Sequence, residues 1–265
     1  MMLDLAFLKE ELKAGTISAA AMVALAVAAM VLFSGCIEQS CTQGSGKIIA
    51  ETRAVESFNS IDLQGWGDLY ITEGPQQPLQ IQGEDNILPL LKTVVSDGLL
   101  KIYTDGCIRT TEPLRIYATA WHLESLETSG ISTITSQSRI SSPALDLKVS
   151  GAGAVYLDVD CIDLNTEISG AGGAVLNGRA DRSNIICSGS GGIDALDLST
   201  NLTRIEVSGS GQAEVNVQSV LDARISGSGS VYYIGTPEKI TQEISGSGRL
   251  ERGSGSSLPW RRDGR

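Results

Sequence analysis

The chain has 265 residues, of which 42% are hydrophobic and 5% aromatic, and its formal net charge is −11. This length and apolar content suffice for one elongated domain with a sizeable core. The acidic balance, without a basic stripe, excludes nucleic acid as a partner and excludes adhesion to an anionic surface by charge alone.

The N-terminal segment predicts export and membrane attachment. An uncharged apolar run from Ala14 to Gly35 ends at Cys36. The sequence Phe33-Ser34-Gly35-Cys36 resembles a lipobox, in which the cysteine thiol takes a diacylglycerol and becomes the new N-terminus. We therefore expect residues 1–36 to be a lipoprotein signal segment with lipidation at Cys36. An uncleaved membrane anchor is the alternative, since about 20 apolar residues also span a bilayer; a buried core helix is a third interpretation.

The next segments predict a tether and the start of a β domain. Residues 37–47 are polar and are expected to be the tether, and residues 48–252 are expected to be the domain. From 48 to 128 the chain holds short apolar or alternating runs that are typical of strands but show no visible repeat. Gly74-Pro75 and Asp97-Gly98 indicate turns between them.

A repeated Ser-Gly-x-Gly motif organises the rest of the domain. It begins at Ser150 and recurs five more times, and an incomplete copy lies at residues 129–132. The serines are separated by 21, 19, 19, 20, 18 and 19 residues. Self-similarity at a fixed period predicts a solenoid, with glycines at its corners. The corner glycines are Gly151, Gly153, Gly170, Gly172, Gly189, Gly191, Gly209, Gly211, Gly227, Gly229, Gly246 and Gly248.

The residues around each motif predict the form of one coil. The position before each serine is apolar and the position before that is charged in five of six copies, and alternation resumes after the glycines. Each repeat is therefore expected to run strand, corner, strand and return loop, with coils paired in parallel about 4.8 Å apart. A flexible Gly/Ser linker would not keep an apolar residue in phase, and a left-handed β-helix would need hexapeptide periodicity.

The order of features resembles the head GIN domain family of autotransporter-adhesin-like proteins, which are usually secreted or lipoproteins. The runs Phe58–Leu63, Gly67–Ile71 and Gly98–Ile102 precede Leu123 to Gly130, and the Ser-Gly-x-Gly coils follow. The similarity covers residues 54–250. The resemblance implies an all-β fold, a single-stranded, right-handed parallel β-helix. The repeat pattern alone does not determine the handedness. The resemblance carries no established activity.

The sequence offers few groups for catalysis. His122 is the one histidine and is expected to be structural, because triads and His-rich metal sites need more partners. Besides Cys36 there are four cysteines, enough for two disulfides in an oxidising compartment. Cys187 occupies an apolar column and is expected in the core, whereas Cys161 is expected in a return loop and Cys41 in the tether. The fourth is Cys107. No catalytic residue and no cofactor is assigned.

Acidic residues supply the candidates for a cation or for glycoside hydrolysis. Asp158, Asp160 and Asp163 are expected in one loop and, with Asp194, are weak candidates for Ca²⁺; a solvated acidic loop is preferred. A column of carboxylates at Glu167, Glu206 and Glu243 alternates with Lys148, Ile186 and Arg224. Stacking would place opposite charges side by side, so this column is interpreted as a salt-bridge ladder rather than a catalytic pair.

These observations favour a non-catalytic surface module on the extracytoplasmic face of the cell envelope, acting in adhesion or ligand presentation. A carbohydrate-active enzyme on a β-helix and an extracytoplasmic assembly or signalling partner are the alternatives. A surface on which tyrosine and tryptophan side chains stack against sugar rings is a further alternative, although these residues are scattered along the sequence. Residues 253–265 are expected to form a disordered tail, with a cap over the last coil as the other interpretation, and exposed end strands allow a homo-oligomer.

Overall fold

The computed structural model describes residues 41–253. The expected signal or anchor segment with Cys36, residues 37–40 of the tether and residues 254–265 of the tail lie outside the described residues. Within residues 41–253, no helix is long and apolar enough to cross a membrane.

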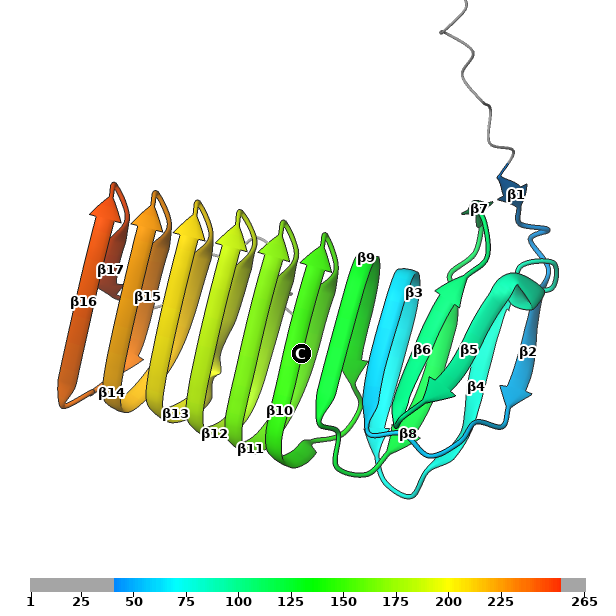
Figure 1. The fold of residues 1–265 in the computed structure, drawn as a ribbon, viewed down its shortest axis with the longest axis horizontal. Helices are drawn as coiled ribbons and strands as arrows, with labels where there is room; N and C mark the ends of the chain where they lie inside the picture. The colour runs from blue at the N-terminus through cyan, green and yellow to red at the C-terminus, as the bar shows by residue number, and fades with distance from the viewer. Residues whose placement is uncertain (1–40, 254–265) are drawn as a thin grey trace, which may run out of the picture. The chain divides into compact units, whose positions relative to one another are not determined.

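The repeats fold into a β-solenoid, as the sequence predicts (Figure 1). Each strand pairs in parallel with the strand of the next coil, with Ser-Gly stacked on Ser-Gly throughout. The successive strands are β10 (Ile140–Gly151), β11 (Ala154–Gly170), β12 (Gly173–Gly189), β13 (Gly192–Gly209), β14 (Gln212–Gly227), β15 (Ser230–Gly235), β16 (Lys239–Gly246) and β17 (Arg249–Arg252).

The glycine corners stack directly on one another. Gly189 has φ of +108°, and a Cβ on it would lie 2.6 Å from the carbonyl oxygen of Gly170 in the coil before. The second glycine of a motif is needed for space: a Cβ on Gly172 would lie 2.6 Å from the Gly153 oxygen and 2.9 Å from Val149 Cγ1. Amide N–H groups of one corner donate to carbonyls of the corner before, as Ser190 N does to Gly170 O at 3.0 Å.

The return loop expected in each repeat is not a loop. Strand β11 runs unbroken from Ala154 to Gly170, and a bend at Ile162 reverses which side chains point inward. Before the bend the odd positions, such as Val159, are buried, and after it the even positions, such as Leu164, are buried. We call this bend the second corner of the coil. It lies at Pro143, Ile162, Asp181 and Asn201, where the pairing of neighbouring coils skips one residue.

The repeat pattern also reaches into the N-terminal part, where the sequence shows none. Strand β3 (Ser60–Glu73) pairs with β9 (Ser125–Ser136), and Gly65 lies beside Gly130. Gln64-Gly65-Trp66-Gly67 is therefore a glycine corner. Strands β4 to β8 then follow in the chain as an insertion, which we call the excursion, before β9 continues the coils. Gly65 and Gly67 both have positive φ.

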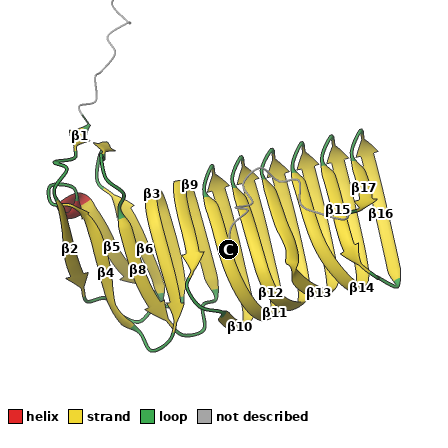
Figure 2. Ribbon diagram, turned by 180° about the vertical axis from the view of Figure 1, so that it is seen from behind, coloured by secondary structure: helices red, strands yellow, loops and turns green. Residues whose placement is uncertain are grey.

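That excursion closes the N-terminal end of the solenoid (Figure 2). Strands β6 (Leu99–Thr104) and β8 (Arg115–Ala120) pair in parallel with the two halves of β3. The other strands pair antiparallel: β4 (Gln77–Glu84) with β8 and β2 (Ile48–Arg53), and β5 (Leu91–Ser96) with β6. A 3₁₀ helix, η1 (Leu88–Leu90), precedes β5, and its Leu88 is fully buried.

Residues 41–47, expected as part of the tether, pack against this N-terminal end. Strand β1 (Thr42–Gln43) pairs with β7 (Ile108–Arg109), and Cys41 forms a disulfide with Cys107. The buried Glu84 carboxylate accepts hydrogen bonds from Gly46 N at 2.7 Å and Thr111 Oγ1 at 2.6 Å. The hydrogen bond from Thr111 is the main reason why the pKa of Glu84 is lowered.

Candidate binding groove

The aspartates considered for Ca²⁺ do not form a loop. Asp158, Asp160 and Asp163 lie in strand β11, and each pairs with an arginine of a neighbouring coil. The closest N–O distances are 2.9 Å to Arg139, 2.9 Å to Arg179 and 2.6 Å to Arg182, respectively. The Arg182 guanidinium, as donor and as charge, lowers the pKa of Asp163. The expectation of an acidic loop was wrong, because the strand continues through the second corner.

The fourth candidate, Asp194, is buried in β13 and accepts the Leu196 N–H at 3.3 Å. Within residues 41–253 no three His, Cys, Asp or Glu side chains come together in a way that could hold a metal ion.

The expected salt-bridge ladder has the predicted register. Lys148 lies beside Glu167, and Arg224 lies between Glu206 and Glu243. Among these neighbours Arg224 and Glu243 form an ion pair at 3.6 Å, whereas Lys148 reaches back to Glu127 at 3.4 Å. These carboxylates face cations rather than one another, as expected for ordinary sheet stabilisation.

The two cysteines outside the disulfide are both in the core. Cys187 is fully buried, as its apolar column predicts, and Cys161 is buried in β11 rather than placed in a return loop. Burial raises the pKa of each thiol to about 11. Both are protonated at neutral pH, and neither is a ready nucleophile.

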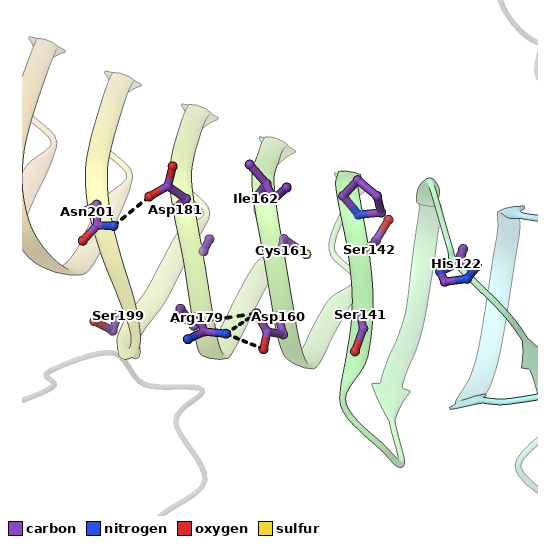
Figure 3. Close-up of a pocket in the computed structure, with 12 residues that line it drawn as sticks. His122, Ser141, Ser142, Asp160, Cys161, Ile162, Arg179, Asp181, Ser199 and Asn201 are labelled. Atoms are coloured by element: carbon purple, nitrogen blue, oxygen red, sulfur yellow. Dashed lines mark hydrogen bonds and ion pairs between the residues drawn. The ribbon is translucent and has the colours of Figure 1, made fainter.

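A hollow with a volume of about 630 Å³ lies along the second corner (Figure 3). We call it the corner groove. Three corresponding positions in each of three successive coils and two in the fourth line it, and His122 lies at one end. These positions are Ser141, Ser142 and Pro143 of β10; Asp160, Cys161 and Ile162 of β11; Arg179, Ala180 and Asp181 of β12; and Ser199 and Asn201 of β13.

Stacking explains why a hollow forms there. Ser142, Cys161 and Ala180 are neighbours in the inward column next to the second corner. All three side chains are buried and point inward, so backbone forms the floor between the two flanking columns of outward side chains. The parallel register places these residues side by side in three successive coils, so the groove crosses the strands instead of following one of them.

The rim presents hydrogen-bonding groups held in place by neighbouring coils. Arg179 donates to both carboxylate oxygens of Asp160, at 2.9 and 3.0 Å, and Asn201 Nδ2 donates to Asp181 at 2.7 Å (Figure 3). Ile162 is 52% exposed and adds an apolar surface between them. A second hollow of about 480 Å³ shares His122, Ser142 and Pro143 and extends the groove towards Glu124 and Asp146.

The groove is suited to holding a ligand rather than to attacking it. The Ser142 hydroxyl donates to the Ala144 carbonyl oxygen at 2.7 Å, and the Cys161 thiol is protonated. Asp160 is engaged by Arg179. His122, expected to be structural, has φ of +52° and lies at the end of the groove, next to Trp121, which is 53% exposed.

Sequence reasoning missed this groove. Pro143, Ile162, Asp181 and Asn201 share no residue type, so the second corner leaves no motif. The one available signal was the coil period itself, which places residues about 19 apart in the same column.

Comparison with known proteins gives one family and one fold. A family model described as "Putative auto-transporter adhesin, head GIN domain" matches residues 57–237. No curated protein matches the chain.

Among solved structures, a "putative adhesin" from Bacteroides fragilis NCTC 9343 is 28% identical, with a TM-score of 0.75, over 79% of this chain and 99% of that one. A "putative lipid binding protein" from Parabacteroides distasonis ATCC 8503 is 22% identical, with a TM-score of 0.69, over 81% and 100%. The latter likeness shows the fold alone.

Proposed function

Because the chain belongs to the head GIN domain family of adhesin-like proteins, we propose that it is a non-catalytic recognition module of the cell envelope that binds a neutral polysaccharide in the corner groove. The observation that carries this proposal is the groove itself, built from corresponding positions of four successive coils. Its volume lies in the range of ligand sites in proteins, about 300–1,000 Å³.

The geometry favours a polymer with a short repeat. Coils follow one another at about 4.8 Å, so four coils offer equivalent positions over about 14 Å. A sugar unit advances a polysaccharide by a similar step, so one unit can meet one coil. The rim groups of Arg179, Asp181 and Asn201 supply donors and acceptors for sugar hydroxyls, and Ile162 supplies a surface for a ring face.

Charge selects a neutral ligand over an anionic one. Within the groove Asp160 and Asp181 outnumber Arg179, and the whole chain carries a net charge of −11. A polyanion would be repelled at long range, whereas a neutral chain of hydroxyl groups would not be. We further propose attachment to the membrane through lipidated Cys36, so that the groove is displayed at the cell surface.

The test is a screen of the full chain, purified in mild detergent, against immobilised neutral, acidic and amino polysaccharides. We expect saturable binding to a neutral polysaccharide. The double variant Arg179→Ala, Asn201→Ala should bind about 30-fold more weakly, from two hydrogen-bonding side chains at about 1 kcal/mol each.

Arg224→Ala is the matched control, because Arg224 also reaches a carboxylate of the next coil, at 3.6 Å, and does not line the groove. Equal loss in this control would show that the groove is not the site. Release of sugar products would replace the proposal by a carbohydrate-active enzyme. Binding to no glycan by folded protein would favour an assembly or signalling partner.

A further inference from the structure

The last coil of the solenoid has strands beside it on one side only. β16 pairs with β14, and β17 pairs with β15. Within residues 41–253 no strand lies along their other edges, so backbone N–H and C=O groups there have no strand to pair with. Figure 1 shows β16 and β17 at the opposite end of the stack from β1 and β2.

The apolar core is open at this end. In β14 the inward residues Leu221 and Ile225 are 0% and 2% exposed. Their neighbours in β16, Ile240 and Ile244, are 42% and 40% exposed. Both pairs hold the same place in the coil, so the exposure arises because no described strand follows β16. Apolar side chains along a free strand edge are typical of a surface that pairs with another chain.

The charge of this end suits a second copy of the same chain. The whole chain carries a net charge of −11, so two copies repel each other at long range. Residues 239–252 of the last coil differ, because they carry charges of both signs. Three are basic and two are acidic: Lys239, Arg249, Arg252, Glu243 and Glu251. A charged side chain here can therefore meet the opposite charge on a second copy.

A two-fold axis at this end places two β16 strands side by side and antiparallel. Inward side chains stay inward only in every second register, because a shift by one residue turns each side chain to the other face. With Gln242 opposite its own copy, Ile240 lies opposite Ile244 of the second copy. Lys239 is then a diagonal neighbour of Glu243 of the second copy, within reach of a long side chain.

The neighbouring register is less favourable. Centred on Thr241, it places Lys239 directly opposite Glu243, but Ile240 then lies opposite Gln242. An exposed ion pair contributes little, whereas burying isoleucine against isoleucine removes apolar surface from water. The register centred on Gln242 therefore fits the edge better.

We propose that two copies of the chain associate head to head through β16, so that their sheets continue across the contact. The N-terminal end offers no matching coil for a head-to-tail contact, since the antiparallel strands β2 and β5 lie there. A two-fold contact also closes on itself and gives a dimer rather than a filament. This inference goes beyond the proposed function and does not depend on the ligand of the corner groove.

Analytical ultracentrifugation of the full chain in mild detergent, over a wide range of concentration, tests the proposal. We expect a reversible equilibrium between monomer and dimer. The double variant Ile240→Lys, Ile244→Lys should dimerise about a hundredfold more weakly, because it sets like charges opposite each other and two-fold symmetry makes each substitution act twice. Both side chains are exposed in the single molecule, so the variant should fold, which circular dichroism checks.

A milder variant keeps both isoleucines. Lys239→Glu brings a second carboxylate near Glu243 of the other copy and should weaken dimerisation several-fold. It keeps the test open if the double variant does not fold.

Ile186→Lys is the matched control, since Ile186 is 37% exposed on the outward face of β12, away from β16. It should leave dimerisation unchanged, and association through the N-terminal segment or the detergent would be the same in every variant. A wild type that stays monomeric at all concentrations would overturn the proposal, because the edge would then have another occupant or none. So would equal dimerisation of wild type and the β16 variants, or species that grow beyond the dimer.

Discussion

The two glycines of each corner have different tasks. The first adopts positive φ, and the second leaves room for a carbonyl and a branched side chain of the preceding coil. Neither is replaceable by serine or alanine without strain, whereas the residue between them points to solvent and varies between alanine and serine in the six complete motifs. The first glycine of Ser-Gly-x-Gly is thus required by the backbone conformation of the corner, and the second by the close stacking of coils.

Substitution of a first glycine should therefore be costly. We expect Gly189→Ala to lower the free energy of unfolding by about 3 kcal/mol, since the left-handed conformation is unfavourable for alanine and the new Cβ would crowd Gly170 O. Denaturant unfolding measures the change. Ser190→Ala, one residue away and exposed, should stay within about 0.5 kcal/mol of wild type. A similar loss for both variants would contradict the stacking argument.

The coils were predictable where the chain repeats a residue type, and several strands of residues 48–128 were predictable from short alternating runs, such as those of β4 and β6. Glycine corners repeat because backbone geometry demands glycine there. The second corner demands only a bend, which Pro143, Ile162 and Asp181 all accept, so the groove built on it was invisible. Gln64–Gly67 was missed for another reason: the excursion through β4–β8 separates this corner from the next coil by more than three coil lengths of sequence.

At the scale of elements, the N-terminal end of the solenoid is covered and tied. Strands β2, β4 and β5 add antiparallel pairings outside the coils, and the disulfide Cys41–Cys107 joins the start of the domain to β7. The other end is different: β16 is exposed along its length, with Ile240 and Ile244 each about 40% exposed. Cys41, where the described residues begin, thus lies at the closed end.

Breaking the disulfide should weaken the closed end. The two cysteines are 66 residues apart, so chain entropy alone predicts a loss of about 4 kcal/mol on removal of the cross-link. We expect reductant to lower the unfolding midpoint of the wild type and to leave Cys41→Ser, Cys107→Ser unchanged at its already lower midpoint. Denaturant unfolding with and without reductant checks this. Equal stability of oxidised and reduced wild type would show that β1 is held by other contacts.

At the scale of the whole molecule, regular stacking makes the surface periodic. Four coils contribute corresponding positions to the corner groove, one strand spacing apart, so under the proposed function an elongated ligand would meet a series of related subsites. The Arg179–Asp160 ion pair and the Asn201–Asp181 hydrogen bond hold these side chains in place, which would reduce the entropy lost on binding of the proposed ligand. The acidic net charge would disfavour anionic polymers at the same surface.

The most direct test of this account measures affinity against ligand length. Oligosaccharides of one to eight units, prepared from the retained polysaccharide, would be titrated calorimetrically into the full chain. The groove spans four coils, about 14 Å, so affinity should rise with each unit up to about four and then level off. A single sugar that binds as tightly as the longer chains, or an affinity that keeps rising to eight units, would contradict a groove with one subsite per coil.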